Sequence, residues 1–348
     1  MDVKEVLNKL CSQWSPSGFE ASVDQIAKEL LEPLTDEVRI DAAGRNVMGF
    51  LRCGKPGAKT LLLDAHLDEV GFAVADMEDG FLRFRNIGGV DPRLLADREV
   101  MICAEPPIFG VISCLAPHVQ KAGDADKTTP IEELGIDIGL TQEEAQKRVP
   151  MGTPIVFRQP FMELDGGRVC SKSLDDRSCF AALLRALELL QEVERDVDIC
   201  VLGSACEEVG GWGAQTAAYA LAPDWCIAVD VTFARSAGLS ESQVPCELGS
   251  GPAIGVGPVI PRWMSNRLKA KAAALEIPYR TEILSGYTGT NGDDFQTARE
   301  GIATAVVSLP LKYMHTPVEI IDPEDIEQTA RLLAAFAENL GKEAEQVC

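Results

Sequence analysis

The sequence lacks long apolar runs. No stretch of its 348 residues approaches the roughly 20 consecutive apolar residues that a membrane-spanning helix needs, and the opening residues 1–5 lack the apolar segment of a signal peptide. We therefore expect a cytoplasmic protein that does not insert into a membrane. Internal repeats, linkers and low-complexity segments are absent as well.

Closely spaced cysteine pairs are also absent. The eleven cysteines are scattered, and some of them, such as Cys200 and Cys226, lie inside apolar runs. No two have the C-x-x-C spacing of a zinc knuckle or a redox pair. We therefore expect buried, reduced thiols rather than thiolate ligands.

Positive charge is scarce. The chain has 32 Lys and Arg residues against 54 Asp and Glu residues, which gives a formal net charge of −22. Such a balance argues against a surface that binds nucleic-acid phosphates and favours solubility. Part of the negative charge is available for metal ligands.

Apolar runs and helical patterns predict an α/β fold. At ~100–200 residues per domain, the length suggests two domains. Short apolar runs lie near amphipathic stretches, as in a covered, mixed and largely parallel sheet flanked by helices. The predicted strands contain residues 61–63, 199–202, 226–229 and 305–307, and the predicted helices are 3–10, 23–31, 178–193, 264–276 and 322–340.

The segment from about 72 to 163 has a different character. Its short alternating segments are broken by Gly and Pro, and few helical patterns occur. Because the sequence on both sides follows the same strand-and-helix pattern, the segment is predicted to be inserted into one domain. We therefore expect a domain of residues 1–71 and 164–348, interrupted by a small β-rich domain of residues 72–163.

Only three histidines are present, so their surroundings are informative. His66 follows the first predicted strand, and Asp68 comes two residues later. In an extended backbone these two side chains share a face, so the imidazole can hold a metal while the carboxylate orients it. The alternative, a lone surface histidine, is weakened by this pairing.

Two pairs of adjacent acidic residues have simpler explanations when taken alone. Asp175 and Asp176 open a predicted helix, where they can complement the helix dipole. Glu207 and Glu208 follow a predicted strand, where a charge pair usually lies in a solvated loop.

The remaining signals bring these positions together. Asp230 ends an apolar strand, where a buried carboxylate costs free energy unless a cation or hydrogen bonds compensate it. His315 also follows a strand. Most of the positions thus lie at the carboxyl ends of strands, where open α/β sheets gather their sites. Three carboxylates and two imidazoles suit two divalent ions, Zn, Co or Mn, that share one bridging ligand.

As an ordered set, the motifs resemble the M42 family of metalloaminopeptidases, whose clan relatives include glutamyl aminopeptidases and tetrahedral peptidase assemblies. The resemblance spans nearly the whole chain. The motifs are DAHLDEVG at 64–71, IDIG at 136–139, LDDR at 174–177, EEVG at 207–210, VDVT at 229–232 and YMHTPVE at 313–319.

The resemblance implies a specific set of metal ligands. Asp175 would bridge two divalent ions in each subunit. His66 and Asp230 would bind one ion, and Glu208 and His315 would bind the other. A cis peptide bond after Asp175 is implied by the wider clan.

The resemblance also implies an activity, the removal of the first residue of short peptides by a metal-bridged hydroxide. Glu207 would be the general base, and Asp68 would orient His66. His118 matches no ligand position and is interpreted as structural.

Three positions depart from the family pattern. Trp212 stands at the arginine position of the usual Gly-x-Arg-Gly-Ala pattern. Phe233 stands where the family usually has a histidine, and Lys312 stands where it usually has an arginine. None is an implied ligand, so we expect the chemistry to be retained. The preferred first residue of the substrate stays open, because such changes can alter the walls of the pocket.

Assembly is a further expectation from the resemblance. Residues 72–163 would mediate dimerisation, and the dimers would build a closed dodecamer. A small domain remote from the ligands has no evident catalytic role, and exposed sheet edges are natural places for chains to join.

Two other functions are consistent with parts of the sequence. An endoglucanase-like glycoside hydrolase needs only two carboxylates, but it leaves the two histidines unexplained. A non-catalytic assembly subunit would be expected to lack Glu207, which is present.

Overall fold

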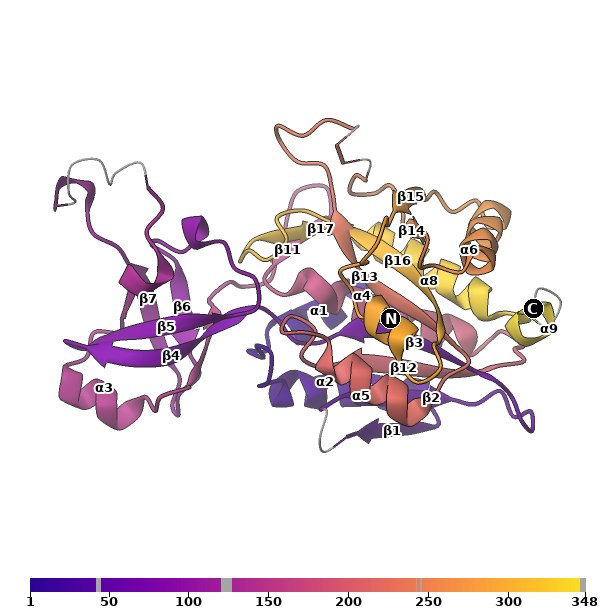
Figure 1. Ribbon diagram of the computed structural model, residues 1–348, viewed down its shortest axis with the longest axis horizontal. Coiled ribbons are helices and arrows are strands. Elements are labelled where there is room, and N and C mark those ends of the chain that lie inside the picture. The colour runs from indigo at the N-terminus through magenta and orange to yellow at the C-terminus, as the bar shows by residue number, and fades with distance from the viewer. Residues whose placement is uncertain (42–44, 120–126, 242, 245, 345–348) are drawn as a thin grey trace.

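A computed structural model describes residues 1–41, 45–119, 127–241, 243–244 and 246–344 (Figure 1). Its centre is an eight-stranded sheet in the order β1-β2-β12-β3-β13-β16-β14-β15. β12, β3, β13 and β16 are mutually parallel, whereas β2 and β14 join them antiparallel. The strands are β1 (Glu37–Ile40), β2 (Val47–Leu51), β3 (Thr60–His66), β12 (Asp198–Ser204), β13 (Trp225–Phe233), β14 (Ala253–Val256), β15 (Arg280–Ile283) and β16 (Ala303–Leu311).

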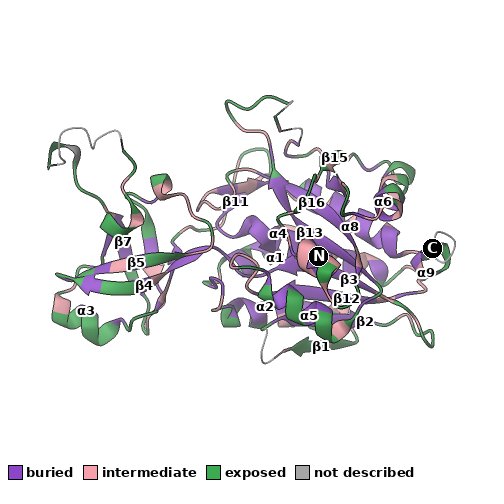
Figure 2. Ribbon diagram, viewed as in Figure 1, coloured by how far each residue is buried: buried purple, intermediate pink, exposed green. Residues whose placement is uncertain are grey.

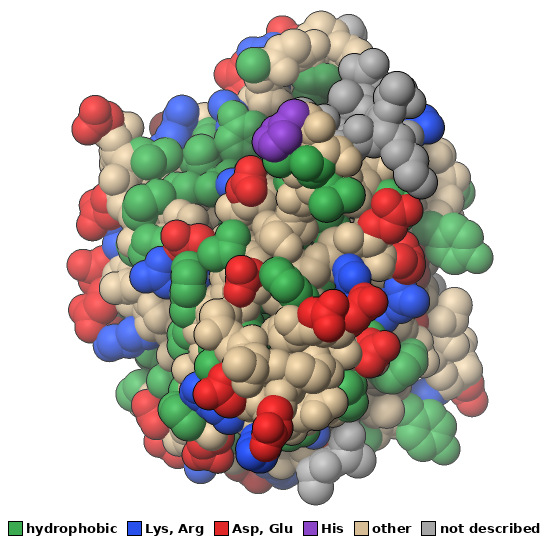
Figure 3. Space-filling view, turned by 90° about the vertical axis from the view of Figure 1, so that its left-hand side faces the viewer, with side chains coloured by type: hydrophobic (Ala, Val, Ile, Leu, Met, Phe, Trp, Pro, Cys, Tyr) green, Lys and Arg blue, Asp and Glu red, His purple; other side chains and the backbone are tan. Residues whose placement is uncertain are grey.

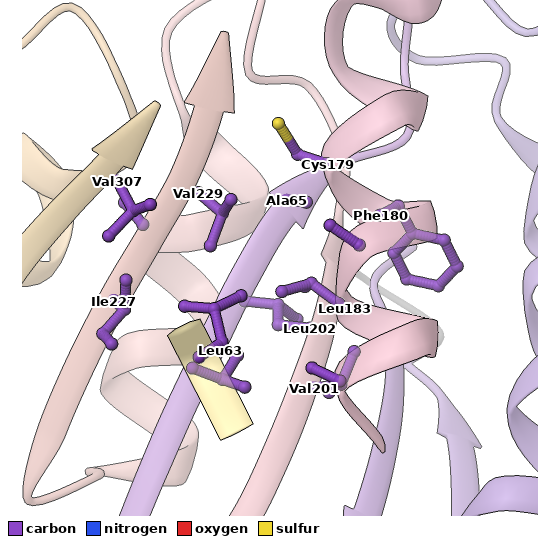
Figure 4. Close-up of a cluster of buried hydrophobic side chains, with 14 of the residues drawn as sticks. Leu63, Ala65, Cys179, Phe180, Leu183, Val201, Leu202, Ile227, Val229 and Val307 are labelled. Atoms are coloured by element: carbon purple, nitrogen blue, oxygen red, sulfur yellow. The ribbon is translucent and has the colours of Figure 1, made fainter. Parts of the chain in front are cut away.

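The central strands are buried on both faces. In β3 every residue after Thr60 is buried, which requires cover on both sides of the sheet (Figure 2). Figure 4 shows Leu63 and Ala65 of β3 in one buried cluster with Leu183 and Phe180 of a helix. Each fully buried large apolar side chain contributes about 1.5–3 kcal/mol, so these runs determine where the sheet forms.

Helices flank the sheet, as predicted. α4 packs on β3 and β13 and against α8, and α5 contacts β12. The predicted helices are all present, with ends shifted by a few residues. The helices outside the β-rich segment are α1 (Val3–Cys11), α2 (Ala21–Leu31), α4 (Leu174–Leu190), α5 (Trp212–Leu221), α6 (Arg262–Ala274), α7 (Gly292–Thr297), α8 (Pro323–Ala337) and α9 (Leu340–Ala344). The mixed α/β fold expected from the sequence is confirmed.

The β-rich segment forms a closed six-stranded barrel, at the left of Figure 1. It has its own apolar cluster, in which Phe72 makes edge-to-face contacts with Phe84 at 5.1 Å and with Phe157 at 5.3 Å. The elements are β4 (Gly71–Glu78), β5 (Phe81–Ile87), β6 (Glu99–Ile102), β7 (Ile108–Ser113), β8 (Gly135–Asp137), β9 (Pro154–Phe157) and α3 (Gln142–Arg148).

Closure of the barrel gives each of its strands a neighbour on both sides, although β5 pairs with β8 only at Leu82 and Ile136. The expectation that exposed edges of this segment join chains stays a prediction, and the two neighbours of each barrel strand limit it to the parts of the strands that are unpaired on one side. The division of the chain into domains at residues 72 and 163 stays a prediction.

Smaller elements complete the structure. β10 (Met162–Glu163), β11 (Val169–Ser171) and β17 (Glu319–Ile321) form a three-stranded sheet. Short 3-10 helices are η1 (Glu32–Leu34), η2 (Pro92–Leu94), η3 (Pro117–Val119) and η4 (Ile131–Glu133). The cysteines in the described ranges are free thiols, six of them buried. None of the helices in these ranges is both long and apolar enough to cross a membrane.

Candidate metal centre

His66 is the last residue of β3, and its ring faces a carboxylate of α4. Its Nε2 lies 3.2 Å from Oδ1 of Asp175. Its Nδ1 lies 3.2 Å from the backbone oxygen of Asp68 and 3.5 Å from that residue's Oδ1. Because a carbonyl oxygen only accepts, Nδ1 is assigned the proton, which leaves the Nε2 lone pair for a ligand.

His315 approaches the same carboxylate from the loop after β16. Its Nε2 lies 3.3 Å from Oδ2 of Asp175 and 3.4 Å from Oε1 of Glu208. Its Nδ1 donates to the backbone oxygen of Gly89 at 2.8 Å. The two imidazoles thus turn the same nitrogen to opposite oxygens of one aspartate.

The ligand atoms form two groups that share Asp175. One group contains His66, Asp175 and Asp230, the other contains Asp175, Glu208 and His315, and within each group the atoms lie within 4.8 Å of one another. The five residues predicted as ligands are thus brought together. Asp230 differs from expectation in one respect, because it lies inside β13 rather than at its end.

Asp68 connects the two sides of this centre. It is fully buried and accepts hydrogen bonds from Oγ of Ser17 at 2.6 Å and from the backbone N–H groups of Glu207 at 3.1 Å and Glu208 at 3.2 Å. The same side chain that approaches His66 therefore also fixes the backbone of the acidic pair. Glu207 lines the pocket but belongs to neither ligand group.

The sequence assigned no role to Glu319, which supports two residues of the centre. It accepts hydrogen bonds from the backbone N–H of Asp175 at 3.1 Å and of His315 at 2.9 Å. A charged residue beside the apolar residues of β17 is the sequence signal that marks such a buried acceptor.

Asp176, which the sequence suggested only as a complement to the helix dipole, is a second supporting residue. It is fully buried and accepts from the backbone N–H of His66 at 3.2 Å. The peptide bond between Asp175 and Asp176 is cis, as the resemblance implied.

A buried ion-pair network lies behind the centre. Nζ of Lys172 donates to both carboxylate oxygens of Glu69 at 2.8 Å, and Nη2 of Arg177 donates to one of them at 3.2 Å. Arg177 also donates to the backbone oxygen of Leu67 at 3.0 Å. Because all three charges are buried and paired, they fix the loop after β3 against the start of α4.

Negative charge is crowded at the centre. Burial, reinforced by the Asp175 carboxylate, raises the pKa of Glu208 to about 8, and burial raises the pKa of Glu207 to about 7. Burial also raises the pKa of Asp230 far above its usual range. A cation offsets the cost of burying such carboxylates, and carboxylate and imidazole donors suit Zn, Co or Mn. The residues therefore fit a divalent metal site.

The barrel segment contributes to this centre. Besides the Gly89 contact with His315, a Cβ atom added to Gly88 would lie 3.0 Å from Cγ1 of Val70 and 3.2 Å from Cβ of Glu208. The expectation that residues 72–163 are remote from the ligands is therefore wrong, because the connection after β5 folds back over them.

A pocket of about 320 Å³ opens on the ligand groups. Phe233, which departs from the family pattern, lines it and is 61% exposed. Trp212 begins α5 with the same exposure, and neither Trp212 nor Lys312 is among the lining residues. His118 is exposed and belongs to neither ligand group. The pocket is lined by His66, Asp175, Glu207, Glu208, Asp230, Val231, Thr232, Phe233, Glu282, Thr288, Gly289, Thr290, Val306, Ser308, Met314 and His315.

Comparisons with known proteins cover nearly the whole chain. Residues 46–332 match the family model of the M42 glutamyl aminopeptidases. The chain is 34% identical to the lysyl aminopeptidase of Pyrococcus furiosus over 97% of each protein. Aminopeptidase APDkam598 from the archaeon Desulfurococcus kamchatkensis has a similar structure, with a TM-score of 0.90, 35% identity and coverage of 97% of this chain and 94% of that one. The TET1 peptidase of Pyrococcus horikoshii, which can assemble into a tetrahedron or a large octahedral shell, has a TM-score of 0.84, 28% identity and coverage of 97% and 99%.

Proposed function

Because this chain belongs to the M42 glutamyl aminopeptidase family and is an aminopeptidase, we propose that it hydrolyses the first peptide bond of short peptides with two divalent metal ions, Zn, Co or Mn. The observation that carries the proposal is the sharing of Asp175 between two ligand groups. His66 and Asp230 would complete one metal site, and Glu208 and His315 the other. The membership confirms the resemblance expected from the motifs.

The side chains around the pocket would have different roles in the reaction. Ions held by the two groups would polarise the scissile carbonyl and make a water molecule more acidic. Glu207, as general base, would accept a proton from the attacking water and deliver it to the leaving amine as the C–N bond breaks. Asp68 would keep His66 and the Glu207 backbone in position.

The test is chelation followed by metal return. Peptide hydrolysis should disappear after chelation and return with Zn, Co or Mn, measured on a panel of amino-acyl chromogenic substrates. Acetylation of the amino end of a good peptide should abolish its cleavage. Cleavage of the blocked peptide at an internal bond, or metal-independent hydrolysis of cellulose without peptide hydrolysis, would overturn the proposal.

We also propose that the barrel is an inserted domain that mediates dimerisation and that dimers build a dodecamer. Assembly of the Pyrococcus horikoshii TET1 peptidase supports this. The barrel carries exposed apolar side chains, among them Phe81, Phe109 and Met151, and Figure 3 shows the face of the molecule on which the barrel lies. A closed particle in the cytoplasm would admit short peptides to its active sites and exclude folded proteins.

A further inference from the structure

Glu282 adds to the pocket a carboxylate that neither ligand group uses. It lies in β15, the edge strand of the main sheet, and is half-buried. Its Oε1 accepts from Oγ1 of Thr232 at 2.6 Å, and its Oε2 accepts from Oγ of Ser308 at 2.7 Å. Since each carboxylate oxygen has two lone pairs, each retains capacity to accept another hydrogen bond.

The charge of Glu282 has no counterion in the pocket wall. No lysine or arginine occurs among the described residues that line this pocket. The positive charge of two divalent ions would be balanced by four carboxylates, those of Asp175, Glu207, Glu208 and Asp230. The negative charge of Glu282 would then not be balanced by the metal ions. A cationic substrate group would be attracted to it, and an acidic one repelled.

The hydrogen bonds of Glu282 place it beside the ligand groups and outside them. Ser308 is the register partner of Asp230, and Thr232 lies two residues further along β13, about 6.6 Å from Asp230. The α-amino nitrogen of a peptide is only two bonds from the scissile carbonyl carbon, which must lie at the ligand groups. Glu282 is therefore placed to meet the side chain of the first residue.

The rest of the pocket wall suits a long side chain with a charged end. Phe233, Val306 and Met314 line the same pocket and offer apolar surface to an aliphatic stem. Lysine and arginine combine such a stem with a terminal group that donates several hydrogen bonds.

We propose that Glu282 is a specificity-determining residue that selects substrates with lysine or arginine at the amino end. This inference rests on the proposed aminopeptidase function and adds the substrate class. Thr232 and Ser308 position the carboxylate, and the ammonium or guanidinium group of the first residue donates to its oxygens.

The experiment compares kcat/KM for the Lys, Arg, Leu and Glu p-nitroanilides. The wild-type protein should favour Lys and Arg. Glu282→Gln keeps the shape and removes the charge, so it should lower kcat/KM for Lys and Arg by about 10- to 100-fold and change that for Leu by less than about threefold. Glu282→Lys should shift the preference towards Glu. Glu300→Gln, an exposed glutamate outside the pocket, is the matched control.

The outcomes distinguish a failure of this inference from a failure of the proposed aminopeptidase function. Equal losses on all four substrates in Glu282→Gln would identify an anchor for the α-amino group and overturn the proposal. A wild-type preference for Leu or Glu would also overturn it while leaving the aminopeptidase function intact. A metal-loaded protein that cleaves none of the four would instead contradict the function itself, and this inference with it.

Discussion

The backbone oxygen of Gly89 accepts a hydrogen bond from Nδ1 of His315 at 2.8 Å. Gly89 lies in the connection that leaves β5 of the barrel, whereas His315 follows β16 of the main sheet. The contact fixes the tautomer in which Nε2 faces Asp175 and Glu208. The position of the barrel is therefore coupled to the geometry of one ligand group.

Gly88→Ala should weaken metal binding. Gly88 has φ +75°, and an added Cβ would lie 3.2 Å from Cβ of Glu208 and 3.0 Å from Cγ1 of Val70. Moving the residues that support ligands typically costs 10–100-fold in metal affinity or activity, so we expect a loss of about that size. Titration of the metal-free variant with Zn, followed calorimetrically, measures it.

The matched control for this variant is Gly54→Ala. Gly54 has φ +74°, but an added Cβ there meets no atom within 4 Å. Both variants should lose roughly 1–2 kcal/mol of stability from the left-handed backbone, and only Gly88→Ala should lose metal affinity. Equal metal affinities in the two variants would contradict a role for this connection.

Glu207→Gln should retain both metals and lose turnover. The substitution removes the proton acceptor and leaves every residue of the ligand groups in place. General acid–base catalysis contributes ~10²–10⁴-fold, so kcat should fall by about that factor. Asp175→Ala is the comparison, because it removes the shared ligand and should lose metal as well as activity. Metal content by mass spectrometry distinguishes the two, and a near-normal kcat in Glu207→Gln would refute its assignment as base.

In the metal-free protein, the free energy of unfolding should decrease as pH rises. Burial raises the pKa of Glu207 to about 7 and that of Glu208 to about 8. Burial lowers the pKa of His315, but the hydrogen bond to Asp175 and the charge of Glu208 outweigh it and bring that pKa to about 10. In each case the folded state binds the proton more tightly than the unfolded state.

The sign of the pH effect follows from these shifts. The contributions of Glu207 and Glu208 to the free energy of unfolding are fully present below about pH 4.3 and are lost as pH rises through about 7 to 8. The contribution of His315 is lost between about pH 6.5 and 10. The Tm of the metal-free protein should therefore fall from pH 5 to pH 9, and Glu208→Gln should make the fall shallower. Scanning calorimetry of the chelated protein checks this, and a flat or rising Tm would disprove it.

Local sequence patterns predicted the main sheet, and the family resemblance named the residues that meet at the centre, but neither predicted the contacts that support these residues. The runs 61–63 in β3 and 226–229 in β13 are continuous and apolar, so their burial determines where these strands form. The prediction that this strand ends at Asp230 is wrong, because pairing with β16 extends β13 through Phe233, opposite Leu311. The end of a strand depends on its neighbour as much as on its own residues.

The support by Glu319 and Gly89 depends on contacts between distant parts of the chain. Glu319 lies 144 residues from Asp175, and Gly89 lies 226 residues from His315. Both contacts involve backbone groups, and every residue other than proline presents the same backbone donor and acceptor. The charge of Glu319 beside apolar residues can mark it as a buried acceptor, but no residue pattern shows which distant backbone group either partner will meet before the fold brings them together.

Assembly should depend on exposed side chains of the barrel, because each barrel strand already has a neighbour on both sides. Phe109 in β7 is 45% exposed and Met151 is 56% exposed, although large apolar side chains are usually covered in the final assembly. Light scattering during size exclusion should therefore show dimers and a dodecamer, and Phe109→Asp or Met151→Asp should shift the distribution to smaller species.

Tyr219→Asp, an exposed position on α5, is the control and should leave the distribution unchanged. A monomer at all concentrations would contradict both proposals on assembly, whereas a stable dimer that the barrel variants dissociate would support the barrel contact and exclude the closed particle.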